Sequence, residues 1–260
     1  MNEDWSPMLL SLCRQVGSDM MLTYEQHLKN PMAFERKENN TPLTAADTSA
    51  HNALVAGLNN IDSSIPIISE ESSEAELGLC KTWNKFWLID PLDGTKEFID
   101  GTGEFCISIA LVENAKPVFG FIYAPVTKVA WWGGLEVAAT KYSDNVSETI
   151  SCDSAPSNLV ASWRGHYRKD VTALVAETSY TKVSMGSALK FCLIAEGKAQ
   201  IYPSLGPTSE WDSAGGQAIV EAAGGIVVGV DGKPLTYNQR DSFANPPFYA
   251  LADISLLPKQ

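Results

Sequence analysis

Three groups of acidic residues stand where apolar segments of the sequence begin or end. Glu70 and Glu71 follow the apolar residues 65–68, Asp90 follows the apolar residues 86–89, and Asp212 lies at the start of a predicted late helix. A single acid at such a place is ordinarily a helix cap or a solvated loop charge. Several acids that directly follow buried segments instead indicate a site that uses their charge.

The spacing of Asp90 and Asp93 indicates how two of these carboxylates meet. Asp90 ends an apolar strand, Pro91 lacks the N–H that would continue the strand's ladder, and Gly94 permits a tight turn. If a helical turn begins there, side chains three positions apart share a face, so Asp90 and Asp93 are expected to converge. Mg²⁺ binds carboxylates together with water and phosphate oxygens. Two such ions about 3.5–4 Å apart can hold the attacking and leaving oxygens of a phosphoryl transfer.

The residues after Asp93 have the character of a phosphate site. Gly94, Thr95 and Lys96 are predicted to form a helix N-terminus, whose free N–H groups suit an anion. An EF-hand is excluded because Leu92 and Gly94 stand where oxygen ligands are needed. The sequence has no GxxxxGK[ST] loop and no GxSxG elbow. The remaining mechanism is hydrolysis by metal-activated water.

The composition limits the partners. The 260 residues are 45% hydrophobic, and 31 acidic residues against 19 basic ones give a net charge of −12. A field of this sign repels a nucleic-acid polymer, and no run rich in Lys and Arg opposes it. A small phosphorylated molecule is repelled as well unless cations lie between it and the protein. The sequence therefore predicts a small-molecule partner and a bound metal.

The cysteines and the hydropathy pattern predict the compartment. Five cysteines without CxxC spacing are expected to be reduced and buried. The N-terminal residues lack the pattern of a signal peptide, and no apolar run approaches the ~20 residues of a transmembrane segment. We expect a cytoplasmic protein, either free or held peripherally on the inner face of the cell membrane, as a monomer or a homodimer.

The elements that must position these residues follow from periodicity and turn signals. Thr44 and Asp47 are spaced as a capping box that opens a helix. Gly133 and Gly134 are expected at the bend of a strand pair within residues 129–139. The other predicted elements are a helix from residue 5 to about 29, hairpin strands at 105–111 and 118–123, strands at 159–162 and 200–202, and helices at 171–177, 187–196 and from 211 to 224. We expect two halves, residues 1–150 and 151–260, that share one continuous core.

Four separated motifs carry a resemblance to a known family. In chain order they are Asp47, Glu70-Glu71, the run from Asp90 to Thr95, and Trp211-Asp212 followed by Gly224-Gly225. Together they resemble the lithium-sensitive, magnesium-dependent phosphomonoesterases of the inositol monophosphatase and fructose-1,6-bisphosphatase superfamily. Residues 90–99, 186–192 and 195–203 are most similar to its bacterial 3′(2′),5′-bisphosphate nucleotidases. The resemblance implies an α/β (α+β) fold, a layered αβαβα sandwich with the site between its halves.

The resemblance also implies residue roles. The implied ligands of one Mg²⁺ are Glu70, Asp90 and the Leu92 carbonyl, and those of a second are Asp90, Asp93 and Asp212, with a third, looser ion near Glu70 and Asp47. Thr95, paired with Asp47, would orient and deprotonate water, and Gly94, Thr95 and Lys96 would line the phosphate. The implied substrate is adenosine 3′,5′-bisphosphate, cleaved to AMP and phosphate.

Substrate specificity depends on other residues. The implied substrate contacts are Gly186, Ser187, Lys190, Arg164 and His166, together with the ligands Glu70, Asp93 and Asp212. Ser204 stands where relatives often place an arginine, and Arg164 can replace that cation. Inositol monophosphate and a sugar bisphosphate stay open as substrates, and so does a non-catalytic metal-dependent binder. The presence of both Thr95 and Asp47 favours an enzyme.

Overall fold

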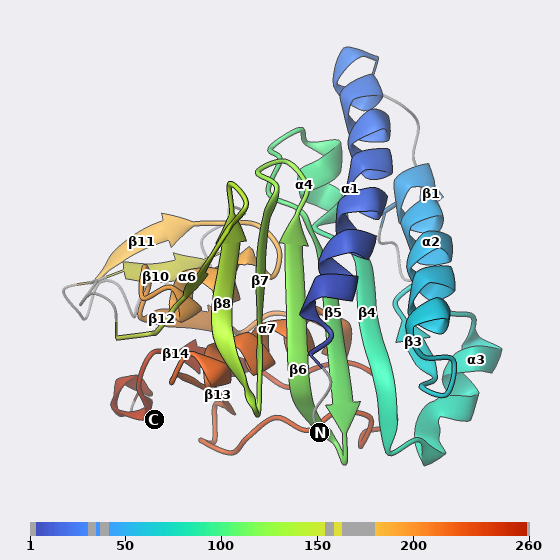
Figure 1. Ribbon diagram of the computed structural model, residues 1–260. Coiled ribbons are helices and arrows are strands. Elements are labelled where there is room, and N and C mark those ends of the chain that lie inside the picture. The colour runs from blue at the N-terminus through green and yellow to red at the C-terminus, as the bar shows by residue number, and fades with distance from the viewer. Residues whose placement is uncertain (1–3, 31–34, 37–41, 154–158, 163–179, 259–260) are drawn as a thin grey trace.

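The computed structural model describes residues 4–30, 35–36, 42–153, 159–162 and 180–258. They form layers of helices and sheets (Figure 1). On one side lie α1 (Ser6–Lys29) and α2 (Ala45–Ile61), which pack on each other and on a seven-stranded sheet. Behind that sheet lies α7 (Glu210–Ala222), and a five-stranded sheet follows.

The first two helices form where the sequence predicts them. α1 buries Leu9, Cys13 and Val16 at helical spacing, and Pro7 lies in its first turn. The capping box of α2 is present: the Thr44 side chain accepts from the Asp47 backbone N–H, and the Asp47 carboxylate accepts from the Thr44 N–H at 2.7 Å. The carboxylate of Asp47 is therefore fixed at the start of α2.

The large sheet has the strand order β3-β4-β5-β6-β7-β8-β9, and every neighbouring pair is antiparallel except β3 and β4. The predicted hairpin between β5 and β6 is present, and its turn residues Asn114 and Ala115 have φ of 50° and 64°. The strands are β3 (Ile67–Ser69), β4 (Lys85–Asp93), β5 (Cys106–Glu113), β6 (Lys116–Ala124), β7 (Val129–Gly134), β8 (Val137–Ser143) and β9 (Val146–Thr149).

One predicted bend is wrong by two residues. Gly133 and Gly134 end β7, and the chain turns at residues 135–136 instead. A Cβ atom on Gly133 would lie 2.8 Å from Ala222 of α7. This glycine therefore permits close packing between sheet and helix, and a turn does not require it.

The small sheet has the order β11-β10-β12-β14-β13, with β10 parallel to both of its neighbours and the remaining pairs antiparallel. Its strands are β10 (Leu159–Ser162), β11 (Thr181–Ser184), β12 (Ile201–Ser204), β13 (Ile226–Gly229) and β14 (Phe248–Leu251). The short helix α6 (Leu189–Ala195) packs on this sheet and on α7. One buried apolar cluster includes residues from before and after residue 150, such as Trp131 and Phe248.

The remaining elements are short. They are the strands β1 (Glu35–Arg36) and β2 (Pro42–Leu43), the helices α3 (Glu74–Leu79) and α4 (Thr95–Ile99), and the 3₁₀ turns η1 (Cys80–Thr82) and η2 (Ile254–Leu256). The helix predicted at 171–177 lies outside the described residues. All five cysteines are buried and unpaired, as predicted. Across the described ranges, no helix combines the length and the apolar character needed to cross a membrane.

Candidate active site

A bulge in β4 lies between Asp90 and Asp93. Asp90 pairs with Ser108 and Asp93 with Cys106, so two residues of β4 stand opposite one residue of β5. The prediction that the strand stops at Pro91 and continues as a helical turn is therefore wrong. Pro91 is tolerated because it lies inside the bulge, where the ladder is interrupted and its missing N–H costs no bond.

A cluster of three carboxylates lies beside this bulge. Ligand atoms of Glu70, Asp90 and Asp212 all lie within 4.8 Å of one another. They come from the end of β3, from β4 and from the first turn of α7. The Glu70 N–H donates to the Ile89 carbonyl at 3.1 Å, which ties the Glu70 backbone to β4. The structure thus joins two of the acids predicted in the first half, Glu70 and Asp90, to the one predicted in the second half.

The electrostatics of this cluster favour a bound cation. Asp90 is 2% exposed, and burial together with Glu70, Asp93 and Asp212 raises its pKa well above the ordinary value. Burial, together with Asp93 and Glu70, also raises the pKa of Asp212. Carboxylate oxygens without sulfur or imidazole are the donor set of a hard divalent cation such as Mg²⁺. The cluster therefore fits such an ion.

Asp93 lies next to the cluster but is held differently. Its Oδ2 accepts the backbone N–H of Ala188, just before α6, and lies 3.7 Å from the Cys106 sulfur. Burial raises the pKa of Asp93 to about 6, and the nearby Lys190 acts in the opposite direction. The bond to Ala188 ties the bulge of β4 to the start of α6.

Thr95 and Asp47 form the pair that was predicted. The Thr95 hydroxyl lies 3.0 Å from Asp47 Oδ1 and 3.2 Å from the Leu92 carbonyl oxygen. Asp47 is 2% exposed, and its other oxygen, Oδ2, accepts from the Thr44 hydroxyl at 2.6 Å. Both carboxylate oxygens of Asp47 are thereby engaged, one by Thr95 and the other by the start of α2.

A cavity of about 380 Å³ opens beside these groups. Its lining residues include Asp93, Asp212, Lys190 and Tyr202. The residues that complete the wall are Gly94, Glu97, Ser162, Ser187, Ala188, Pro203, Ser204, Leu205, Gly206, Pro207 and Thr208. A buried lysine in a cavity lined by acids and apolar side chains suits a small anionic molecule with an apolar part.

The inositol monophosphatase family model matches residues 2–255. The chain belongs to the inositol monophosphatase family. Enzymes of this family are metal-dependent, in agreement with the carboxylate cluster on β3, β4 and α7. The family resemblance predicted from the four sequence motifs is confirmed.

Sequence relatives within the inositol monophosphatase family are similar over nearly the whole chain. A relative from Salmonella typhimurium named 3′(2′),5′-bisphosphate nucleotidase CysQ is 44% identical over 238 residues, which cover 91% of this chain and 95% of the relative. The CysQ of Buchnera aphidicola is 40% identical over 257 residues, which cover 96% of each chain. Both carry the nucleotidase name that the resemblance implied.

Solved structures of the family confirm the predicted α+β layered fold. CysQ from Bacteroides thetaiotaomicron, described as a bacterial member of the inositol monophosphatase family, matches with a TM-score of 0.81 and 34% identity over 95% of this chain and 97% of that one. The IMPase of Thermotoga maritima matches with a TM-score of 0.76 over 96% and 92% of the two chains. Its 23% identity means that this second match supports the fold alone.

Lys190 of this family member is a buried cation. It is 5% exposed, its ammonium donates to the Ser187 carbonyl, and it lies 5.1 Å from the centre of the Tyr202 ring. A lone lysine on a helix is ordinarily a solvated surface charge, and the burial of Lys190 rules that interpretation out. α6 begins at Leu189, so the predicted start at residue 187 is two residues early.

The loop before α6 is held on the segment after α4. The Gly186 N–H donates to Glu104 Oε2 at 2.8 Å, and a Cβ atom on Gly186 would lie 2.6 Å from the Glu104 carbonyl oxygen.

The other predicted substrate contacts lie in different surroundings. Gly94 has a φ of +95°, in the left-handed region that favours glycine. Ser204 is buried in the cavity wall, and Lys96 is exposed at the start of α4. Arg164 and His166 lie outside the described residues.

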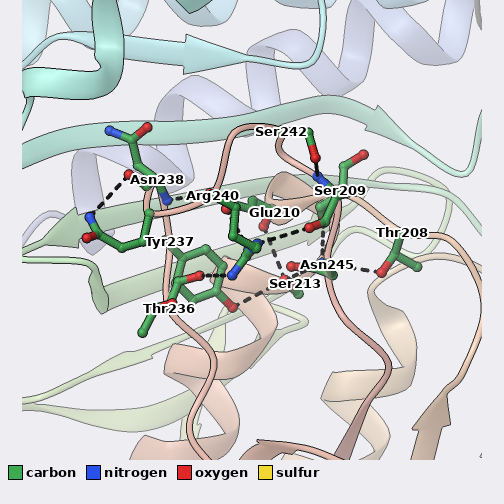
Figure 2. A network of polar contacts seen from close by, with 12 residues as sticks. Thr208, Ser209, Glu210, Ser213, Thr236, Tyr237, Asn238, Arg240, Ser242 and Asn245 are labelled. Atoms are coloured by element: carbon green, nitrogen blue, oxygen red, sulfur yellow. Dashed lines mark hydrogen bonds and ion pairs between the residues drawn. The ribbon is translucent and has the colours of Figure 1, made fainter.

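Sequence reasoning missed a polar network at the start of α7 (Figure 2). Glu210 has no exposed side-chain surface, and burial raises its pKa to about 7. Its carboxylate pairs with Arg240 at 2.5 Å and accepts the Asn238 N–H at 2.7 Å. Both partners follow Glu210 by about thirty positions, in a segment whose polar composition resembles that of any loop. The sequence pattern therefore carried no signal for them.

Proposed function

We propose that this chain is a magnesium-dependent phosphatase that hydrolyses adenosine 3′,5′-bisphosphate to AMP and phosphate. The observation that carries the proposal is the cluster of three carboxylates from Glu70, Asp90 and Asp212, with the Thr95–Asp47 pair close to this cluster in the fold. The printed name of the relatives, 3′(2′),5′-bisphosphate nucleotidase, supports the substrate class.

The proposed ligands divide into two sets. Glu70, Asp90 and the Leu92 carbonyl would hold one Mg²⁺, and Asp90, Asp93 and Asp212 would hold a second, with a looser third ion near Glu70 and Asp47. When bound, Mg²⁺ would neutralise the phosphate and the leaving oxygen and make a nearby water more acidic. Asp93 would keep Oδ1 for a cation, because its Oδ2 accepts the Ala188 N–H. The Leu92 N–H donates to Asp90 Oδ1 at 3.0 Å and the Ala188 N–H donates to Asp93 Oδ2, and these bonds reduce the reorganisation that binding requires.

Thr95 is proposed to bind and orient the attacking water. The Thr95 hydroxyl can donate to Asp47 Oδ1 at 3.0 Å or to the Leu92 carbonyl at 3.2 Å, which leaves a lone pair on Oγ1 to accept a hydrogen bond from water. Asp47 stays oriented because the start of α2 holds its other oxygen. Thr95 therefore orients the water and accepts its proton while the Thr95 hydroxyl proton passes to Asp47 Oδ1.

The substrate occupies the cavity beside this pair. Gly94, Thr95 and Lys96 contact the phosphate that is cleaved. Gly186 and Ser187 lie between the positions of the two phosphates. Lys190 binds that second phosphate, because its ammonium is desolvated in the cavity wall and already oriented. Arg164 and His166 are proposed to add contacts from the same half. The apolar part of the wall, including Leu205 and Pro207, suits the nucleoside.

Comparison of initial rates tests the proposal. With Mg²⁺ present, adenosine 3′,5′-bisphosphate should give a kcat/KM at least about a hundredfold above that of inositol 1-phosphate or fructose 1,6-bisphosphate, about 2.7 kcal/mol of transition-state binding. If the enzyme prefers inositol 1-phosphate or the sugar bisphosphate, the substrate is of that class and the proposal of a nucleotide substrate is wrong. Absence of turnover on all three, with Mg²⁺ still bound, would indicate a non-catalytic binder.

A further inference from the structure

The segment that carries Asn245 forms a short brace against the start of α7. The Asn245 N–H donates to the Thr208 carbonyl at 2.8 Å, and the Glu210 N–H donates to the Phe243 carbonyl at 2.7 Å. Between these two bonds, Ser209 and Ala244 pair as an isolated antiparallel bridge. The brace therefore holds the backbone that leads from the cavity wall into α7.

The Asn245 side chain strengthens this brace. Its amide nitrogen lies 2.6 Å from the Ser209 carbonyl oxygen, 3.0 Å from Ser213 Oγ and 3.2 Å from Thr208 Oγ1 (Figure 2). Its amide oxygen is buried and accepts no hydrogen bond within the part of the chain that the structure describes. A flipped amide would place that oxygen against the Ser209 carbonyl, so the orientation is fixed and the contribution is that of a donor.

Ser209 connects this brace to Asp212. The Ser209 N–H donates to Asp212 Oδ2 at 2.7 Å, and the Ser209 carbonyl accepts the Asp212 N–H at 3.1 Å. That same carbonyl accepts from Asn245, so one peptide oxygen serves both residues. If Asn245 is lost, the Ser209 carbonyl loses the shortest of its bonds, and the direction of the neighbouring peptide N–H is less restricted.

We propose that Asn245 is a positioning residue for Asp212: it fixes the Thr208–Ser209 backbone, which aims the Asp212 carboxylate at Asp90 and Glu70. The inference rests on the proposed function in that Asp212 is taken to be a metal ligand. Hydrogen-bond partners that orient a ligand ordinarily affect metal affinity because they set where the carboxylate lies. Asn245 is uncharged, so it orients Asp212 without adding charge to an already acidic site.

Mg²⁺ binding to the metal-stripped protein tests this role without measuring turnover. Titration calorimetry with Mg²⁺ alone should give a Kd about tenfold weaker for Asn245→Ala than for the parent chain, the effect ordinarily seen when a ligand's partner is lost. Asn245→Asp keeps the shape but places an oxygen against the Ser209 carbonyl, so at least the same loss is expected. This second variant decides the question if Asn245→Ala fails to fold.

Tyr237→Phe is the matched control for stability. The Tyr237 hydroxyl bonds Gln217 at 2.7 Å and lies 3.2 Å from Ser213 Oγ, so its loss also removes buried hydrogen bonds from α7. This variant should melt at a lower temperature with its Mg²⁺ Kd unchanged. An unchanged Kd in a folded Asn245 variant, or an equal weakening in Tyr237→Phe, would overturn the positioning role.

Asp212→Asn separates this inference from the proposed function. Its Mg²⁺ binding should weaken more than that of Asn245→Ala, since it loses the ligand's charge itself. If Asp212→Asn binds Mg²⁺ as the parent chain does, Asp212 is not a ligand, and the proposed function is overturned at its metal site. If Asp212→Asn loses binding while the Asn245 variants keep it, only the positioning role fails.

Discussion

The Thr95 hydroxyl lies 3.0 Å from Asp47 Oδ1, across 48 positions of the chain. The bond joins the start of α4 to the first turn of α2, two elements that approach each other only in the folded protein. Asp47 also completes the capping box of α2, so its carboxylate serves a structural and a proposed chemical role. The two roles are compatible because they use different carboxylate oxygens.

Thr95→Val tests the chemical role of this pair. Valine keeps the shape of threonine but cannot accept a proton, so kcat on adenosine 3′,5′-bisphosphate should fall about 10²–10⁴-fold, the ordinary contribution of a positioned acid or base. KM should change little, and Thr95→Ser should restore most of kcat. A valine variant that keeps more than about a tenth of kcat, a loss below ~1.4 kcal/mol, would exclude Thr95 from water activation.

Asp90→Asn tests the acid shared by both proposed metal sites. The change keeps the size of the side chain but removes a charge that two cations use, so kcat should fall about a thousandfold. In metal-free buffer the same variant should melt at a higher temperature than the parent chain, because Asp90 is buried beside other carboxylates. Scanning calorimetry with and without Mg²⁺ measures this reversal. Equal melting temperatures in chelator, together with retained kcat, would show that Asp90 is not a ligand.

The carboxylates of the cluster could be predicted from the sequence, whereas the backbone conformation of β4 that carries Asp90 and Asp93 could not. Carboxylates directly after buried strands were recognised from Glu70 and Asp90, since an unpaired charge there is costly. The bulge in β4 was not predicted, because its extra residue is set by the pairing with β5 and not by Pro91 alone. The burial of Lys190 was missed for a related reason, since Tyr202 and Ser187 surround it only after α6 packs on the small sheet.

Other features lay beyond local pattern altogether. The partners of Glu210 and the brace formed by Asn245 depend on a loop that returns to α7 after about thirty residues or more, and no short-range periodicity reports such a contact. The division into halves at residue 150 stays a prediction, as do the roles of Arg164 and His166.

Lys190→Ala tests substrate specificity. Loss of the buried ammonium should weaken kcat/KM for adenosine 3′,5′-bisphosphate by about 1.5–3 kcal/mol, the ordinary value of a charge-assisted contact. A substrate with a single phosphate should be affected far less. Lys198→Ala is the matched control, because Lys198 is 56% exposed and pairs with Glu196 instead of lining the cavity. Equal losses on both substrates would mean that Lys190 acts through stability or the general field.

Lithium inhibition is expected from the family resemblance. Li⁺ is similar in size to Mg²⁺ but carries half its charge, so at the second site it compensates the leaving oxygen and product phosphate poorly. Inhibition should deepen as the substrate concentration rises, which an uncompetitive pattern in initial rates would reveal. Activity that is unaffected by millimolar LiCl would place this chain outside the lithium-sensitive members.

Phosphate release from adenosine 3′,5′-bisphosphate, measured before and after chelation, tests the central claim most directly. With a net charge of −12 and several carboxylates facing one phosphate, substrate binding without a cation is electrostatically unfavourable. EDTA should abolish release, and excess Mg²⁺ should restore it with AMP as the second product. Full release of phosphate after exhaustive chelation would contradict the account.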